Sequence, residues 1–197
     1  MEIYYHGSDQ RDLAIIKPNI STHGKKYIYA TKYRNIALLF LCRWNDFLLS
    51  LETTIIDNKL EITLVERYKG AMNDIYLGKS GVIYAFESDN FIKLPEMWEF
   101  EFVSEQEEEV KTFEIINDIL CEIQLLNKTG EIEIYHYPNR PKNIPKDDHD
   151  MVKKSMELYK LSGGKYNALY CIKKFPHLKD EIIKKFIEEY NIDLNNL

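Results

Sequence analysis

Short runs of strand-forming residues, separated by turn residues, dominate the first 116 residues and constrain the fold more than any other feature of the chain. These runs are rich in Ile, Tyr, Val, Phe and Thr, which favour pleated strands. They cover residues 3–5, 26–31, 47–56, 60–65, 82–86, 97–104 and 110–116. Beyond residue 116 the pattern becomes mostly helical. The sequence therefore predicts an α+β fold whose first part is mostly β-structure, followed by a C-terminal helical extension.

The spacing of apolar residues predicts where helices and loops lie. Expected helices cover residues 33–41, with Thr31 as N-cap, and 117–126, 151–161, 165–175 and 178–190. A strand is expected at 131–137, a hairpin turn at 57–59, and irregular chain at 9–24 and 70–80. The acidic run 105–109 is expected to be a solvated turn. Prolines and clustered charges predict a linker at 139–150, so we expect domains at 1–140 and 141–197.

Composition excludes several classes of protein. The length of 197 residues suits one domain, or one domain with an extension. The net charge of −6 argues against a broad DNA-binding surface. Cys42, Cys121 and Cys171 are far apart, and no CxxC pair occurs. We therefore expect reduced thiols, no zinc or other metal site, and a cytoplasmic location.

No membrane span or secretory signal is expected either. The sequence contains no run of about 18 or more apolar residues, the length a spanning helix needs. Its first residues, Met1-Glu2-Ile3-Tyr4-Tyr5, lack a basic segment followed by an apolar one.

Three motifs lie on the predicted strands. The first strand ends in Tyr-His-Gly-Ser, which contains His6, Gly7 and Ser8. The second strand reads Tyr-Ile-Tyr-Ala-Thr and contains Tyr29. A late strand contains Glu-Phe-Glu-Phe-Val at residues 99–103, and this motif includes Glu101. Because side chains alternate along a strand, Glu101 and the Glu two residues before it are expected on one face.

A His-Gly pair on the first strand, a Tyr on the second strand and a Glu on a late strand, in this order, resemble the ADP-ribosyltransferase family. The similarity is to its His-Tyr-Glu type, which is related to poly(ADP-ribose) polymerases and diphtheria toxin, and it covers residues 1 to about 118. The resemblance implies an ADP-ribosyltransferase-like split β-sandwich with NAD as substrate between two small sheets. It implies no metal.

The resemblance also implies which groups hold NAD. His6 would contact the adenosine ribose, and the backbone of Gly7 would pair with the nicotinamide carboxamide, where the missing side chain permits close approach. Ser8 would add a hydroxyl contact. An ordinary histidine at the end of a strand is the structural alternative for His6.

The remaining roles that the resemblance implies concern nicotinamide and the reaction. Tyr29 and Phe40 would stack on the planar nicotinamide ring. Glu101 would orient the ribose and stabilise the sugar cation that forms as nicotinamide leaves. The chain departs from the family pattern at Tyr27, where Gly is common, and at Ala37, where some members carry Ser. Plain core packing for Phe40, and a solvent-facing strand position for Glu101, remain open.

The predicted function is mono-ADP-ribosyl transfer from NAD to a protein or nucleic-acid acceptor, with His6, Tyr29 and Glu101 as the catalytic residues. Three alternatives remain open: a non-catalytic binding module on the same fold, an NAD glycohydrolase, and an RNA 2′-phosphotransferase. The RNA 2′-phosphotransferase would need basic groups that bind the RNA phosphate, and the early candidates are Arg11, Arg34 and Arg43. Glu131 is a second, less favoured candidate for the catalytic carboxylate. No nucleotide-binding glycine loop or Ser or Cys nucleophile motif occurs.

Overall fold

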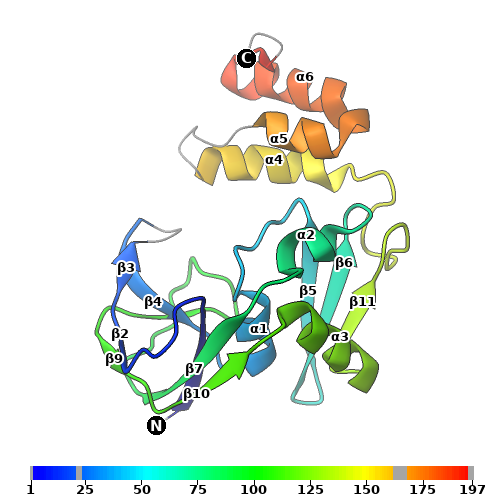
Figure 1. The fold of residues 1–197 in the computed structure, drawn as a ribbon. Helices are drawn as coiled ribbons and strands as arrows, with labels where there is room; N and C mark the ends of the chain where they lie inside the picture. Colours follow the sequence, from blue (N-terminus) through cyan, green and yellow to red (C-terminus); the bar gives the residue numbers. More distant parts are fainter. Residues whose placement is uncertain (1, 21–23, 162–167, 195–197) are drawn as a thin grey trace. The chain divides into compact units, whose positions relative to one another are not determined.

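The computed structural model describes residues 2–20, 24–161 and 168–194, and it is a mixed α+β structure of helices and several small sheets. Contacts divide the chain into two compact units (Figure 1). Unit 1 comprises Met1–Trp44 and Ile75–Thr129, and unit 2 comprises Asn45–Asp74 and Gly130–Leu197. Residues 45–74 thus belong to the same unit as residues 130–197. The predicted division at residue 140 concerns independent domains and stays a prediction.

Unit 1 is built on short antiparallel strands. They are β1 (Glu2–Ser8), β2 (Ile15–Ile16), β3 (Asn19–Ile20), β4 (Lys26–Ala30), β7 (Gly81–Ser88), β8 (Phe102–Ser104), β9 (Glu108–Glu109) and β10 (Thr112–Ile116). One sheet has the order β1-β7-β10, another has the order β3-β4-β8, and β2 pairs with β9. The central strand β7 is almost entirely buried, which explains its continuous apolar sequence.

A single backbone bridge joins the two larger sheets of unit 1. The Tyr5 N–H donates to the Thr31 carbonyl at 2.7 Å, and the Thr31 N–H donates to the Tyr5 carbonyl at 2.9 Å. The bridge places β1 beside β4 at this point. The strands contribute side chains to one buried cluster, which includes Tyr4, Ile28, Ala30 and Phe86.

Helices α1 (Arg34–Leu39) and α3 (Ile119–Thr129) complete unit 1. The apolar spacing predicted both, and both are confirmed with slightly different ends. Thr31 is not the N-cap of α1: that position is Tyr33, and the Thr31 hydroxyl accepts the Tyr33 N–H at 3.3 Å.

Unit 2 contains a three-stranded sheet with the order β11-β6-β5. Strands β5 (Leu49–Ile56) and β6 (Lys59–Glu66) form the predicted hairpin, and β11 (Ile132–Tyr135) runs parallel to β6. The two turn residues, Asp57 and Asn58, have φ of 50° and 63°. Positive φ at both positions is typical of the two-residue turn whose twist suits a hairpin.

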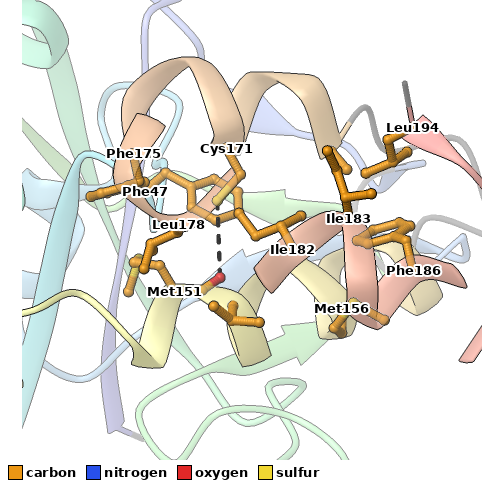
Figure 2. Packing of buried hydrophobic residues seen from close by; sticks show 12 residues of the cluster. Phe47, Met151, Met156, Cys171, Phe175, Leu178, Ile182, Ile183, Phe186 and Leu194 are labelled. Carbon is orange, nitrogen blue, oxygen red and sulfur yellow. Dashed lines mark hydrogen bonds between the residues drawn. The ribbon is translucent and has the colours of Figure 1, made fainter. Parts of the chain in front are cut away.

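Helices α4 (Asp150–Leu161), α5 (Ala168–Lys174) and α6 (Lys179–Tyr190) supply the main core of unit 2, and a 3-10 turn, η1 (Pro176–Leu178), precedes α6. Their apolar faces meet around Cys171, Phe175, Ile182 and Phe186, with Phe47 contributed from before the hairpin (Figure 2). Burial raises the pKa of the Cys171 thiol to about 12, so this cysteine is a packing residue. The predicted helices are confirmed here, although residues 165–167 lie outside the described ranges.

A buried ion-pair network holds the 136–149 loop of unit 2. The Arg67 side chain is fully buried, with Nη2 at 2.5 Å from Asp150 Oδ1 and 3.1 Å from Asp148 Oδ1. Arg140, also buried, places Nη1 at 2.6 Å from Asp148 Oδ1. Two guanidinium groups therefore share the Asp148 carboxylate, which compensates charges that would be costly to bury alone.

Two segments differ from the sequence-based expectation, and in each a side-chain hydrogen bond accompanies the difference. Residues 71–76, expected to be irregular, form helix α2 (Ala71–Tyr76). The Met72 N–H near its start donates to the buried Glu66 carboxylate at 2.9 Å, a cap that local sequence does not reveal. The acidic run also contains a buried residue, Glu108, which lies on β9 and accepts the Ser104 hydroxyl at 2.7 Å. The solvated-turn prediction is wrong at this position.

The late strands also differ from expectation. Residues 97–101 form turns and bends. Within the predicted strand 97–104, only Phe102–Ser104 is a strand. The prediction that Glu99 and Glu101 share one strand face is therefore wrong. The following strand, β10, pairs with β7 instead of with β8. Residues 9–24, expected to be a loop, include the short strands β2 and β3, and 21–23 lie outside the described residues.

Replacing Asp148 with Asn tests the ion-pair network. Asp148 has φ of 60°, a conformation that Asn tolerates, so Asp148→Asn removes the charge with little backbone penalty. Leaving buried guanidinium groups undercompensated should lower the free energy of unfolding by about 3 kcal/mol, measured by urea denaturation. Glu157→Gln, which breaks an exposed 3.6 Å pair with Lys153, is the control and should cost less than about 0.5 kcal/mol. Equal effects in the two variants would contradict the network.

Candidate functional site

The predicted site residues His6 and Tyr29 are joined directly. The His6 Nδ1 lies 2.7 Å from the backbone carbonyl oxygen of Tyr29. A carbonyl only accepts, so Nδ1 carries the proton and Nε2, on the other side of the ring, is the acceptor of the neutral imidazole. Burial lowers the pKa of His6, and the bond to the carbonyl offsets part of this shift. His6 is therefore a neutral histidine with a fixed tautomer at pH 7.

Gly7 is required by packing against α1. A Cβ at this position would lie 2.6 Å from the Ala37 carbonyl oxygen and 3.1 Å from Leu41 Cδ2. Real Cβ atoms do not approach a backbone oxygen so closely. The glycine thus lets β1 lie directly against the helix, a structural role that sequence reasoning missed.

The backbone of Gly7 faces the side on which β1 and β4 separate. Tyr5 directs its N–H and C=O to β4, and strand alternation directs those of Gly7 to the same side. A continued ladder would pair Gly7 with Tyr29. Across the described part of the chain, however, the bridge at Tyr5 and Thr31 is the one pairing between β1 and β4. The Tyr29 carbonyl accepts His6 Nδ1 instead.

Tyr29 lies on β4 among apolar side chains of a neighbouring loop. It is half-buried and packs against a cluster formed by Tyr27, Met97 and Val103. The Tyr27 and Tyr29 rings meet edge to face with centroids 6.0 Å apart, which confirms that both lie on one face of the strand. Val103 is the direct cross-strand partner of Tyr29.

Glu101 belongs to the same loop, residues 92–103. Two backbone hydrogen bonds between Ile92 and Val103, of 2.9 and 3.0 Å, close the loop at its base. Within the loop, the Glu101 N–H donates to the Trp98 carbonyl at 2.9 Å. Glu101 is half-buried and immediately precedes β8, two residues from the cross-strand partner of Tyr29. His6, Tyr29 and Glu101 therefore come from three neighbouring segments of unit 1.

Phe40 contacts this loop through Trp98. The centroids of these two rings are 5.9 Å apart, and Trp44 lies 5.3 Å from Phe40 on another side. Trp98 in turn contacts Phe100 at 5.2 Å. Phe40 and Trp98 remain 39% and 37% exposed, so neither is an ordinary core residue. Sequence reasoning missed Trp98; its place one turn before Glu101 was the available signal.

Other candidate residues occupy separate positions. Ser8 is half-buried, and its hydroxyl accepts the Gln10 N–H at 3.1 Å. Arg34 donates to the carboxylates of Glu114 at 2.6 Å and Glu122 at 2.8 Å, so its charge is already compensated. This pairing removes one of the basic groups on which the RNA phosphotransferase alternative depended. Glu131, the second candidate carboxylate, belongs to unit 2.

Two hollows of the surface are lined by residues of unit 2. One of about 490 Å³ is lined by side chains of α6 alone, including Ile183 and Ile187, and is an open depression of one helix surface. Another of about 210 Å³ lies beside the start of α4, next to Asp46 and Asp150. Neither includes a predicted site residue.

In residues 2–20, 24–161 and 168–194, no group of three or more His, Cys, Asp or Glu side chains is arranged to hold a metal ion. Over the same residues, no helix has the length and apolar character needed to cross a bilayer. Comparison of the chain with protein-family models, with curated protein sequences and with solved structures gives no match.

The packing of Gly7 predicts a destabilised alanine variant. Gly7→Ala would force its Cβ against the Ala37 carbonyl, so the free energy of unfolding should fall by about 1–3 kcal/mol. Urea denaturation measures the change. Ser8→Ala is the adjacent control and should cost less than about 1 kcal/mol. A free energy of unfolding that is the same in Gly7→Ala as in the wild type would contradict the close contact between β1 and α1.

The neutral state of His6 predicts a pH dependence of stability. Its pKa in the folded protein is below that of the unfolded chain, about 6.5. Between these pKa values the unfolded chain binds a proton that the folded protein does not, so this contribution to stability is lost as the pH falls. The unfolding free energy of the wild type should therefore decrease more steeply from pH 7 to pH 5 than that of His6→Gln. Parallel curves would show that His6 titrates normally in the folded protein.

Proposed function

We propose that this protein is an NAD-dependent mono-ADP-ribosyltransferase that uses His6, Gly7, Tyr29 and Glu101. The observation that carries the proposal is the arrangement at the separation of β1 and β4. The His6 ring donates a hydrogen bond to the Tyr29 carbonyl, and Glu101 lies in the 92–103 loop two residues before Val103, the cross-strand partner of Tyr29. A split β-sandwich of the ADP-ribosyltransferase type is part of the same proposal.

NAD would be held first by its polar groups. The His6 Nε2 is an acceptor with a fixed orientation, suited to a ribose hydroxyl donor. The backbone N–H and C=O of Gly7 together match a carboxamide, which presents one acceptor and one donor. The packing of Gly7 against α1 and its proposed contact with NAD are compatible, because the first concerns the Cα side and the second the peptide groups.

The reaction would then break the bond between nicotinamide N1 and the ribose C1′. Nicotinamide leaves with the bonding electron pair, and positive charge develops on the ribose ring. The Glu101 carboxylate stabilises that charge and orients the 2′-hydroxyl. An acceptor nucleophile forms the new bond to C1′ and gives up its proton to Glu101 or to solvent. Tyr29 would supply the ring on which nicotinamide stacks.

Nicotinamide release is the direct test. Purified protein is incubated with NAD, with and without cell lysate as a source of acceptor, beside Glu101→Gln. We expect release that lysate stimulates and that falls about 100-fold or more in the variant, because a neutral amide stabilises the sugar cation poorly. Glu99→Gln is the matched control, since Glu99 is exposed on the preceding turn, and it should retain wild-type release within about twofold.

The other outcomes identify the rival functions. Release that does not depend on lysate would indicate an NAD glycohydrolase with water as acceptor. NAD binding without release would indicate a binding module. Absence of NAD binding, measured by calorimetry, would refute the proposal.

A further inference from the structure

Lys93 is an exposed residue near the start of the 92–103 loop that carries Trp98 and Glu101. Its Nζ donates to the Met97 carbonyl at 3.1 Å, to the Glu101 carbonyl at 3.3 Å, and also to the Trp98 carbonyl. One ammonium group therefore binds three backbone oxygens within five residues. An ammonium has three donors, so this arrangement uses its full capacity.

The three carbonyls would otherwise have no regular ladder to bind them. Residues 97–101 form turns, and strand pairing resumes only at Phe102. Turn carbonyls that converge on one point repel one another, and a cation at that point relieves the repulsion. Lys93 thus stabilises the turns between residues 97 and 101 by binding their carbonyls.

The loop is anchored at both sides of this cation. Its base is the backbone pair between Ile92 and Val103, and its apolar side chains Met97 and Phe100 are buried. Between these anchors the Glu101 N–H donates to the Trp98 carbonyl, and Lys93 also binds the Trp98 and Glu101 carbonyls.

We propose that Lys93 is a positioning residue: its ammonium group holds the loop that carries Glu101 and that packs Trp98 against Phe40. Its catalytic consequence rests on the proposed transferase function. Lys93 touches the loop backbone and acts on the reaction through Glu101. A displacement of a catalytic group by about 1 Å can cost about 100-fold in rate.

Lys93→Met and Lys93→Arg separate the charge of Lys93 from its bulk. Met retains a long apolar stem without donors, whereas Arg retains a cation that donates to carbonyls. Lys111→Met is the matched control in unit 1, because Lys111 is exposed and pairs only loosely with Glu87, at 3.7 Å. Trp44→Phe is introduced in every protein, which leaves Trp98 as the single tryptophan.

Two measurements are made on each variant. The first needs no activity: acrylamide quenching of Trp98 fluorescence and hydrogen exchange of the Glu101 amide. We expect Lys93→Met to increase quenching and to speed exchange at least about tenfold, because local opening of the loop becomes easier. Lys93→Arg and Lys111→Met should resemble the parent protein. The second is the steady-state rate of nicotinamide release, for which kcat should fall about 10- to 100-fold in Lys93→Met with KM nearly unchanged, and recover in Lys93→Arg.

The two measurements distinguish failure of the proposed function from failure of the positioning role. A parent protein that releases no nicotinamide would refute the proposed function, and quenching and exchange would still decide whether Lys93 holds the loop. Unchanged quenching and exchange in Lys93→Met would overturn the positioning role. A loosened loop with unchanged kcat in an active enzyme would overturn it as well.

Discussion

The separation of β1 from β4 is the feature on which the candidate site depends. In the residues that the structure describes, the strands pair at one bridge, between Tyr5 and Thr31. Gly7 makes this geometry possible, since any side chain there would push β1 away from the Ala37 carbonyl of α1. The helix thus fixes β1 from one side, while β7 pairs with it along its whole length. The polar groups at the end of β1 therefore belong to a strand that is held by contacts with both α1 and β7.

His6 links the separated strands without closing them. In a continuous ladder the Tyr29 carbonyl would accept a backbone N–H from β1; here it accepts an imidazole N–H. A side-chain donor satisfies the buried carbonyl and also fixes the tautomer of the ring. The same hydrogen bond therefore serves stability and orientation. A histidine chosen only for packing would not need its second nitrogen directed away from β4.

The sequence predicted the elements that depend on local pattern. The hairpin at Asp57 and Asn58 and the three C-terminal helices follow from turn chemistry and apolar spacing. The motifs at His6 and Tyr29 were likewise placed on their strands correctly. What could not be predicted depends on a side-chain contact from outside the element, such as the Glu66 carboxylate that accepts the Met72 N–H at the start of α2, or on strand pairing distant in sequence, such as β2 with β9. The 92–103 loop was misread because alternating aromatic and acidic residues imitate a strand, while its turns are held by Lys93.

The loop also explains why the aromatic residues of the candidate site cannot be assessed one at a time. Tyr29 packs against Met97 and Val103, and Phe40 packs against Trp98, so both predicted stacking rings contact the same loop. Glu101 lies on it as well. A change in the loop would therefore alter ring placement and carboxylate placement together. If a planar ligand stacks on Tyr29 and Phe40, affinity and turnover should both depend on this loop, whose backbone carbonyls Lys93 binds.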